Sequence, residues 1–312
     1  MPSQPHDPPM SVGGQAILEG VMMRAPGAWA VAVRRPDGII EAMRHPLPRL
    51  SSRSVLARMP FMRGVMVLGE SLTLGYRALT WSAQKAAGDE EEELTKGQIA
   101  LSMAIAFVIF AGLFIVLPAL VAKWTAGESG FAFASIEAVL RLVLFIGYLW
   151  AIGRSNDIRR VFMYHGAEHM SIHAFEAGEP LSVASVSRYR PEHPRCGTNF
   201  LMIVILLSIV IFTLVGRPAW PLLIASRVVG IPVIAGLAYE VLKFAGVRQG
   251  ERLGRFLAAP GLWLQKLTTG VPEPDMIEVA VTSLVSALEA DQVEEVINRG
   301  GVPEAALAAR AV

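Results

Sequence analysis

Four long apolar segments lie between residues 99 and 244, separated by shorter polar stretches. The segments 99–121 and 200–215 contain no charged side chain. A helix needs about 20 residues to cross a bilayer, so the first segment is long enough and the second is short. The pattern predicts membrane-spanning helices, and the alternative for each is a buried helix of a large soluble protein.

The other two segments carry charges inside an apolar sequence. Residues 131–152 include Glu137 and Arg141, which are four apart, share a helix face and can therefore pair. Residues 220–244 include Arg227 and a proline, so this segment is the weakest of the four. Charges at membrane depth are costly, and they indicate pairing, function or a segment that enters the bilayer only in part.

Shorter patterns predict the structure of the amino-terminal region. Residues 28–34 have strand character, 35–38 (RPDG) form a turn signal, and 39–43 can return as the partner strand, so we expect a small β-hairpin. The apolar period of about 3.6 residues over 60–87 predicts a helix that lies on the membrane surface or packs on a polar domain. The acidic run 89–93 is expected to be a solvated linker.

Two further helices are predicted in polar parts of the chain. Residues 156–177 are expected to continue as a helix out of the second span until Gly178-Glu-Pro180 ends it. Residues 276–288 follow the sequence PEPD and are predicted to form an N-capped amphipathic helix. The last dozen residues are expected to fray, and the sequence contains no evident internal repeat.

Composition supports the assignment to membrane proteins. Of the 312 residues, 53% are hydrophobic and 18% are charged, whereas a soluble domain is usually about half apolar and a quarter charged. A net charge of +1 gives no basic field for nucleic-acid binding. The single cysteine excludes an internal disulfide, and the polar start MPSQPHDPPM does not resemble a signal peptide.

The distribution of Lys and Arg predicts the orientation of the spans. Eleven of these residues precede Ile99, and six lie in 153–199, whereas the two other connections between spans contain only Lys123 and Arg217. Positive charge accumulates on the cytoplasmic side, so both termini and the central polar region are expected there. A free thiol in that region would stay reduced.

We therefore predict a mainly α integral membrane protein with about four transmembrane helices and a small cytoplasmic α/β portion. The expected regions are a cytoplasmic amino-terminal region with a hairpin and an amphipathic helix (1–96), transmembrane helices 1–2 (97–153), a cytoplasmic His/Glu/Cys loop (154–198), transmembrane helices 3–4 (199–246) and a cytoplasmic tail (247–312).

The segment YHGAEHMSIHAFE (164–176) carries the most specific chemical pattern. His165, Glu168 and His169 form the pattern H-x-x-E-H, the inverse of the H-E-x-x-H helix of zinc proteases. His165 and His169 are one helical turn apart on the same face, so both imidazoles can bind one ion. Glu168 lies beside them and could orient a water molecule or accept its proton.

Other polar residues can extend or complete this site. His173 continues the polar face, whereas Glu176 lies about 16 Å along the axis from His165 and could serve only His173 or a second site. His193 and Cys196 can approach from the opposite side. Four protein ligands would make a closed structural zinc site, and three would leave an open catalytic one. The alternative is a network of polar side chains without metal.

The segment GGQAILEGVMMR (13–24) is a second dense motif. Its glycines permit a close backbone approach or a positive φ angle. Glu19 is a candidate for a further ligand or base among apolar neighbours. The alternative is a tightly turned structural segment.

Seven blocks of sequence resemble one family in the same order. The blocks are GGQAILEGVMMR, AVAVRRPDG, PFMRG, RVFMYHGAEH, HPRCGTNF, YEVLK and PGLWLQKLTT. Together they resemble the YqhQ family (domain of unknown function 1385) over roughly residues 11–290. The resemblance implies a bacterial membrane protein with a predicted metal dependence, located in the cytoplasmic (inner) membrane.

The resemblance also implies which residues occupy the family's His/Glu/Cys positions, namely His165, Glu168, His169, His193 and Cys196. The chain departs from the expected pattern at Met163, where a polar residue is expected, and at Met170, where a lysine is expected. Loss of that lysine would remove an anion contact and leave the expected ligands intact.

These patterns together favour a metal-dependent hydrolase at the cytoplasmic face of the membrane, with zinc as the expected divalent metal. His165 and His169 would be ligands, Glu168 the general base, and His193 or Cys196 the third ligand. A lipid, a peptide or a membrane-associated metabolite would serve as substrate. The alternatives are a scaffold or assembly factor with a structural metal, and a transporter supported only by Arg227, Glu240 and the interrupted fourth segment.

Overall fold

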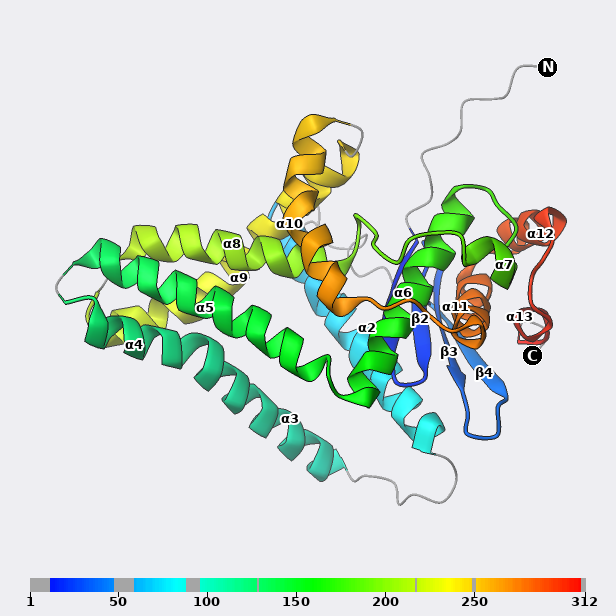
Figure 1. The fold of residues 1–312 in the computed structure, drawn as a ribbon, viewed down its shortest axis with the longest axis horizontal. Helices are drawn as coiled ribbons and strands as arrows, with labels where there is room; N and C mark the ends of the chain where they lie inside the picture. Colours follow the sequence, from blue (N-terminus) through cyan, green and yellow to red (C-terminus); the bar gives the residue numbers. More distant parts are fainter. Residues whose placement is uncertain are drawn as a thin grey trace.

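The computed structural model describes residues 12–47, 59–87, 96–127, 129–216, 218–248 and 251–309. It has a helical bundle at one end and a small α/β part at the other, with helix α6 (Asn156–Glu176) between them (Figure 1). The predicted acidic linker at 89–93 lies outside the described residues.

A four-stranded antiparallel sheet forms the centre of the α/β part. Its strands lie in the order of the sequence: β1 (Gly13–Ile17), β2 (Gly20–Arg24), β3 (Ala28–Arg34) and β4 (Ile40–Pro46). The predicted hairpin is confirmed, because Arg34 pairs with Ile40 and the register continues to Ala28 and Pro46. The GGQ segment adds a second hairpin that was not predicted, with Glu19 at a φ of 48° in its turn.

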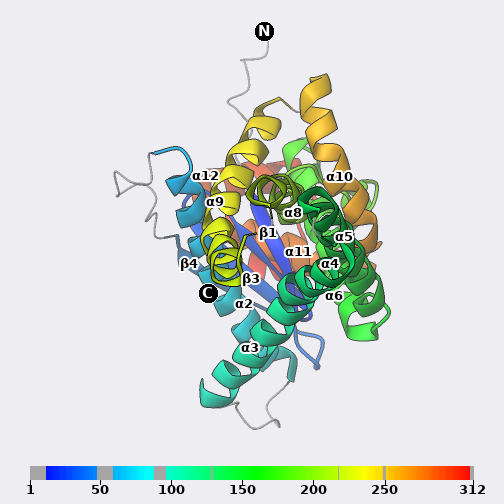
Figure 2. The ribbon, with the colours of Figure 1, turned by 90° about the vertical axis from the view of Figure 1, so that its left-hand side faces the viewer.

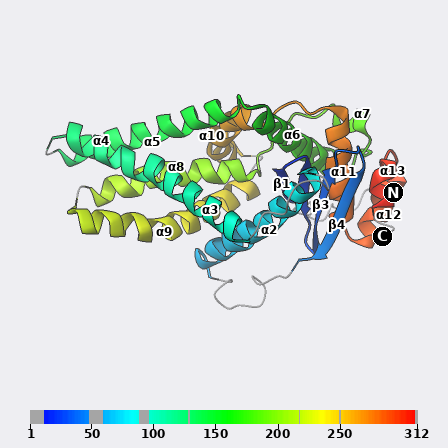
Figure 3. The same ribbon diagram turned by 90° about the horizontal axis from the view of Figure 1, so that it is seen from below.

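Helices cover both faces of the sheet (Figure 3). One face packs on α2 (Met62–Ala87), where Trp29 and Val31 meet Leu74. The other face packs on α6 and α11 (Pro274–Ala287). The predicted helix over 60–87 is therefore confirmed, and it packs on the sheet.

Helix α11 forms where a helix was predicted, but it is neither amphipathic in its burial nor capped by a side chain. Every residue from Met276 to Ala287 except Glu278 is buried, because the sheet, α6 and α13 (Glu304–Ala308) surround most of the helix. The side chain of Glu273 at its N-cap position makes no capping hydrogen bond. Helix α12 (Ala290–Arg299) follows, and Ala306 in α13 is fully buried, so residues 301–309 are packed where fraying was expected; residues 310–312 lie outside the described residues.

Among the described residues, four helices are long and apolar enough to cross a membrane. The first consists of three consecutive elements, namely α3 (Lys96–Ala111), the π-helical turn η2 (Gly112–Val116) and α4 (Leu117–Thr125). The other three are α5 (Gly130–Ile152), α8 (Gly197–Val215) and α9 (Trp220–Val247). The outer surfaces of these helices are apolar, with Phe107 70% and Leu214 82% exposed. Such a surface is compatible with contact to lipid.

The charges that interrupt the apolar segments are paired. Glu137 and Arg141 form the predicted ion pair at 2.6 Å, and Arg227 joins the same carboxylate at 2.7 Å. Glu240 pairs with Arg63 of α2. Glu137, Arg141, Arg227 and Glu240 therefore each have an opposite charge within contact distance, which lowers the cost of charge in an apolar bundle.

Helix α10 (Arg252–Thr268) was not predicted and connects the bundle to the site. Figures 1 and 2 show that it crosses one end of the bundle, where it packs on α8, α9 and α5. Gly261 permits this packing, because a Cβ atom there would overlap the Asn199 side chain. Helix α6 is separated from α5 by a turn at residues 153–155, whereas a continuous helix was predicted.

Candidate metal centre

Helix α6 carries the H-x-x-E-H pattern against the chain that follows α10. Gly166 permits this contact, since a Cβ atom there would lie 2.0 Å from the carbonyl oxygen of Gly270. The backbone N–H of Gly270 also donates to the carbonyl oxygen of Phe162 at 2.8 Å. The close approach brings the last turn of α10 to His165.

His165 is oriented by a backbone carbonyl. Its Nδ1 lies 2.8 Å from the carbonyl oxygen of Thr268, and its Nε2 lies 3.1 Å from Sγ of Cys196. Since a carbonyl can only accept, Nδ1 carries the hydrogen in the neutral imidazole and Nε2 keeps its lone pair. That lone pair points toward the thiol.

His169 repeats this arrangement one turn later. Its Nδ1 donates to the carbonyl oxygen of Pro191 at 2.5 Å. Its Nε2 is buried and has no hydrogen-bond partner among the described residues. Burial lowers the pKa of His169 well below its ordinary value, so the imidazole is neutral and its unpaired Nε2 can act as an electron-pair donor.

Cys196 reaches the same point from the N-cap position of α8. Its Sγ accepts a hydrogen bond from the backbone N–H of Thr198 at 3.3 Å and lies 3.2 Å from the hydroxyl of that residue. Burial raises the pKa of the Cys196 thiol. A buried thiol of this kind is inert unless a cation converts it to the thiolate.

The ligand atoms of His165, His169 and Cys196 all lie within 4.8 Å of one another. This spacing suits a common ion, since zinc binds nitrogen at about 2.0–2.1 Å and sulfur at about 2.3 Å. Metal-binding histidines usually donate their second nitrogen to a carbonyl or carboxylate, and both histidines here donate to backbone carbonyls. The three residues could therefore hold a divalent metal, and the donor set suits zinc.

Glu168 is buried between this group and the sheet. The backbone N–H of Gly14 donates to its carboxylate, and a Cβ atom at that glycine would lie 3.1 Å from Oε1. Burial raises the pKa of Glu168 to about 8, while the charge of His165 lowers it and that of Cys196 raises it. Oε2 has no partner among the described residues, and a carboxyl group with this pKa is largely protonated at neutral pH.

His193 lies outside the group of three. Its Nδ1 accepts from the backbone N–H of Arg195 at 3.2 Å, and its Nε2 faces Glu176 at 3.6 Å. Its ring centroid lies 4.4 Å from that of His173 and 5.6 Å from that of His169. His193 therefore joins a second cluster, and burial lowers its pKa to about 4.

The second cluster also contains His173, Glu176 and Arg195. His173 Nε2 bonds the carbonyl oxygen of Glu192 at 3.0 Å, and Arg195 pairs with Glu176. Glu176 therefore lies with His173 and His193 at the distal end of the helix, and the expectation that it serves His173 or a second site stays a prediction. The guanidinium of Arg195 supplies the positive charge that a metal ion would supply here.

Glu19 lies in a different environment from the metal group. Arg160 donates to both of its carboxylate oxygens at 2.6 Å, and the hydroxyl of Tyr164 lies 3.3 Å away. Its charge is compensated, so Glu19 ties the β1–β2 turn to the start of α6. Met170 packs in the hydrophobic core, and Met163 lies against Gly270.

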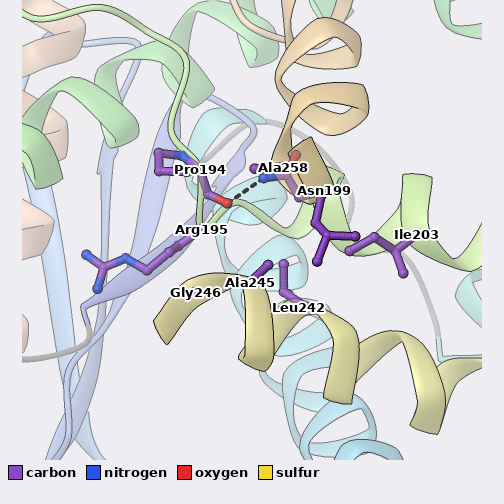
Figure 4. A pocket seen from close by; sticks show the side chains of 9 residues that line it. Pro194, Arg195, Asn199, Ile203, Leu242, Ala245, Gly246 and Ala258 are labelled. Atoms are coloured by element: carbon purple, nitrogen blue, oxygen red, sulfur yellow. Dashed lines mark hydrogen bonds between the residues drawn. The ribbon is translucent and has the colours of Figure 1, made fainter. Parts of the chain in front are cut away.

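Sequence reasoning missed the residues that hold the 190–196 loop. Gln265 is fully buried, and its side-chain amide bonds both the N–H and the C=O of His193, at 2.7 and 2.9 Å. Asn199 donates to the carbonyl oxygen of Pro194, and Figure 4 shows the guanidinium of Arg195 pointing away from this bond. Gln265 and Asn199 lie in the blocks PGLWLQKLTT and HPRCGTNF, which were the only sequence signal for them.

Comparisons with known proteins agree over most of the chain. The family model described as "Protein of unknown function (DUF1385)" matches residues 59–290. The "Uncharacterized protein YqhQ" of Bacillus subtilis (strain 168) is 32% identical over 307 residues, which cover 93% of this chain and 96% of that protein. No solved structure matches. The chain therefore belongs to the DUF1385 family of proteins of unknown function.

Proposed function

We propose that His165, His169 and Cys196 bind one divalent metal ion, with zinc the best fit to two imidazoles and a thiolate. The supporting observation is the orientation of the two histidines. Both donate Nδ1 to backbone carbonyls, and the Nε2 of His169 has no other partner among the described residues. A buried imidazole nitrogen without a partner is unfavourable unless it binds something.

We infer that this chain is a hydrolase and that the site is its active site, at the cytoplasmic face of the membrane. A bound zinc ion supplies Lewis acidity, which lowers the pKa of a water molecule and polarises a carbonyl or phosphoryl group. Burial raises the pKa of Glu168 to about 8, so this side chain would act as the general base once a bound cation stabilises its ionised form. Oε2 has no partner among the described residues, and the N–H of Gly14 holds the carboxylate in place. Proton transfer from the attacking water to Glu168 makes that water nucleophilic.

The proposed location follows from the direction of the spans. Cys196 caps the start of α8, and His165 lies soon after the end of α5, so the site is at one end of the bundle. The same end carries the six Lys and Arg residues of 153–199. The positive-inside rule then places the site and both termini in the cytoplasm, at the inner membrane.

The position of His193 favours a catalytic site over a structural one. A scaffold with a structural metal would use four protein ligands, and His193 was the expected fourth. Its Nε2 faces Glu176, so the described residues offer three ligands. A transporter has little support, because Arg227 pairs with Glu137 and Glu240 pairs with Arg63.

Metal content of the protein purified without chelators tests the proposal. We expect about one zinc per chain, lost in His165→Ala and Cys196→Ala and retained in Glu168→Gln, by inductively coupled plasma mass spectrometry. His193→Ala is the matched control, because it removes a neighbouring buried histidine outside the group. Absence of metal in the wild-type protein, or equal loss in all variants, would refute the metal site.

X-ray absorption at the zinc edge separates the catalytic from the structural alternative. A catalytic site predicts two nitrogen ligands, one sulfur and at least one oxygen. Three nitrogens and one sulfur, reduced to two nitrogens in His193→Ala, would instead show a closed structural site.

A further inference from the structure

Helix α10 has three distinct faces. The first is buried on the bundle through residues that include Gly261 and Leu264. The second is apolar and exposed, with Leu253 48%, Phe256 74% and Trp263 51% exposed. The third is basic and faces the 190–194 loop. An exposed apolar face beside a basic one is typical of helices that lie in the membrane interface.

A groove of about 610 Å³ separates the basic face of α10 from the loop. Arg190, Arg255 and Lys266 line it, and Glu192 is the single acidic group there. None of the three cations forms an ion pair with a residue that the structure describes. The groove therefore has a net positive charge, whereas most of the other arginines that the structure describes have carboxylate partners.

The groove lies where lipid headgroups would be if the four apolar helices cross a bilayer. Helix α10 crosses the bundle at the end where α8 begins and α9 ends (Figure 1). Trp263 belongs both to the groove and to the exposed apolar face. Tryptophan is enriched at the interface between hydrocarbon and headgroups, which suits this position.

We propose that the groove binds an anionic glycerophospholipid from the cytoplasmic leaflet. The phosphate lies among Arg190, Arg255 and Lys266, and the acyl chains extend over Trp263 and Phe256. Charge complementarity selects an anionic headgroup. The adjoining apolar face selects a lipid over free phosphate, because inorganic phosphate would gain nothing from it.

The bound lipid would lie against the loop that orients the candidate metal centre. The inner side of this loop supplies the carbonyls of Pro191 and Glu192 to His169 and His173. Its outer side, at Glu192 and Pro194, forms a wall of the groove. Lipid binding itself depends only on the outer side, so this proposal does not rest on the metal.

Quenching of tryptophan fluorescence by brominated lipids tests the proposal. The full chain is reconstituted in phosphatidylcholine nanodiscs that contain brominated phosphatidylglycerol or brominated phosphatidylcholine. The signal of Trp263 is the difference between the wild type and Trp263→Phe. We expect stronger quenching by the anionic lipid, with an apparent affinity about fivefold lower in Arg255→Gln, since one cation near a membrane contributes about that factor.

The control variant is Arg252→Gln, which removes the same charge from the same helix outside the groove. Equal quenching by both lipids, or an equal effect of Arg252→Gln and Arg255→Gln, would overturn the proposal. Competition by inorganic phosphate would overturn the choice of lipid. Unchanged lipid preference in His165→Ala would support a site independent of the metal, even if the metal proposal failed.

Discussion

Gln265 should control the position of the loop that carries His193 and Cys196. Its side chain is fully buried, its Oε1 accepts from the N–H of His193, and its Nε2 donates to the C=O of the same residue. The substitution Gln265→Leu keeps most of the volume and leaves both backbone groups buried without partners. Each unsatisfied group costs about 1–3 kcal/mol, so the loop loses roughly 2–6 kcal/mol.

Hydrogen–deuterium exchange of the peptide that spans residues 190–196 measures this effect. A loss of about 2 kcal/mol in local opening corresponds to an exchange rate about thirtyfold higher. Gln265→Glu should give a smaller increase, because it retains the acceptor for the N–H of His193. Gln292→Leu, in α12, should leave this peptide unchanged. Unchanged exchange in Gln265→Leu would show that the two hydrogen bonds do not hold the loop.

Two further predictions concern the membrane bundle. Glu137→Gln leaves two buried arginines without a carboxylate, so it should destabilise the bundle by about 3–5 kcal/mol. The measurement is the temperature of thermal unfolding in detergent, which should fall. Glu240→Gln is the control and should have a smaller effect, because its ion pair with Arg63 is partly exposed. In a Cys196→Ser background, Ser129→Cys should react with a membrane-impermeant maleimide in intact cells, and Ser187→Cys only after permeabilisation. The reverse labelling would contradict the proposed orientation.

Local sequence patterns were sufficient for the elements whose formation depends on their own residues. The four apolar helices follow from length and composition, because a membrane-length apolar run is a local property. The β3–β4 hairpin follows from its turn signal and its β-rich flanks. The shared face of His165 and His169 follows from the helical period, and in the structure their ligand atoms lie within 4.8 Å of each other.

Other elements could not be predicted because their environment decides them. The β1–β2 hairpin turns at Glu19, a non-glycine residue with positive φ, and the carboxylate of this residue pairs with Arg160 of α6, 141 residues away in the sequence. Helix α11 has the composition of an amphipathic helix, and only the packing of the sheet, α6 and α13 buries every residue from Met276 to Ala287 except Glu278. The period of apolar residues along a helix does not predict how many neighbouring elements will cover that helix.

Residue types and local spacing identify the side chains available for the candidate site, and the packing of distant segments selects which of them meet. His193 and Cys196 are three residues apart and were equally good candidates. The Gln265 amide holds the backbone of His193 so that its imidazole faces Glu176, whereas the start of α8 directs Cys196 to His165. His165 is oriented by the carbonyl of Thr268, which is 103 residues away in the sequence. That carbonyl reaches His165 because α10 packs on the bundle, and no local sequence pattern predicts this packing.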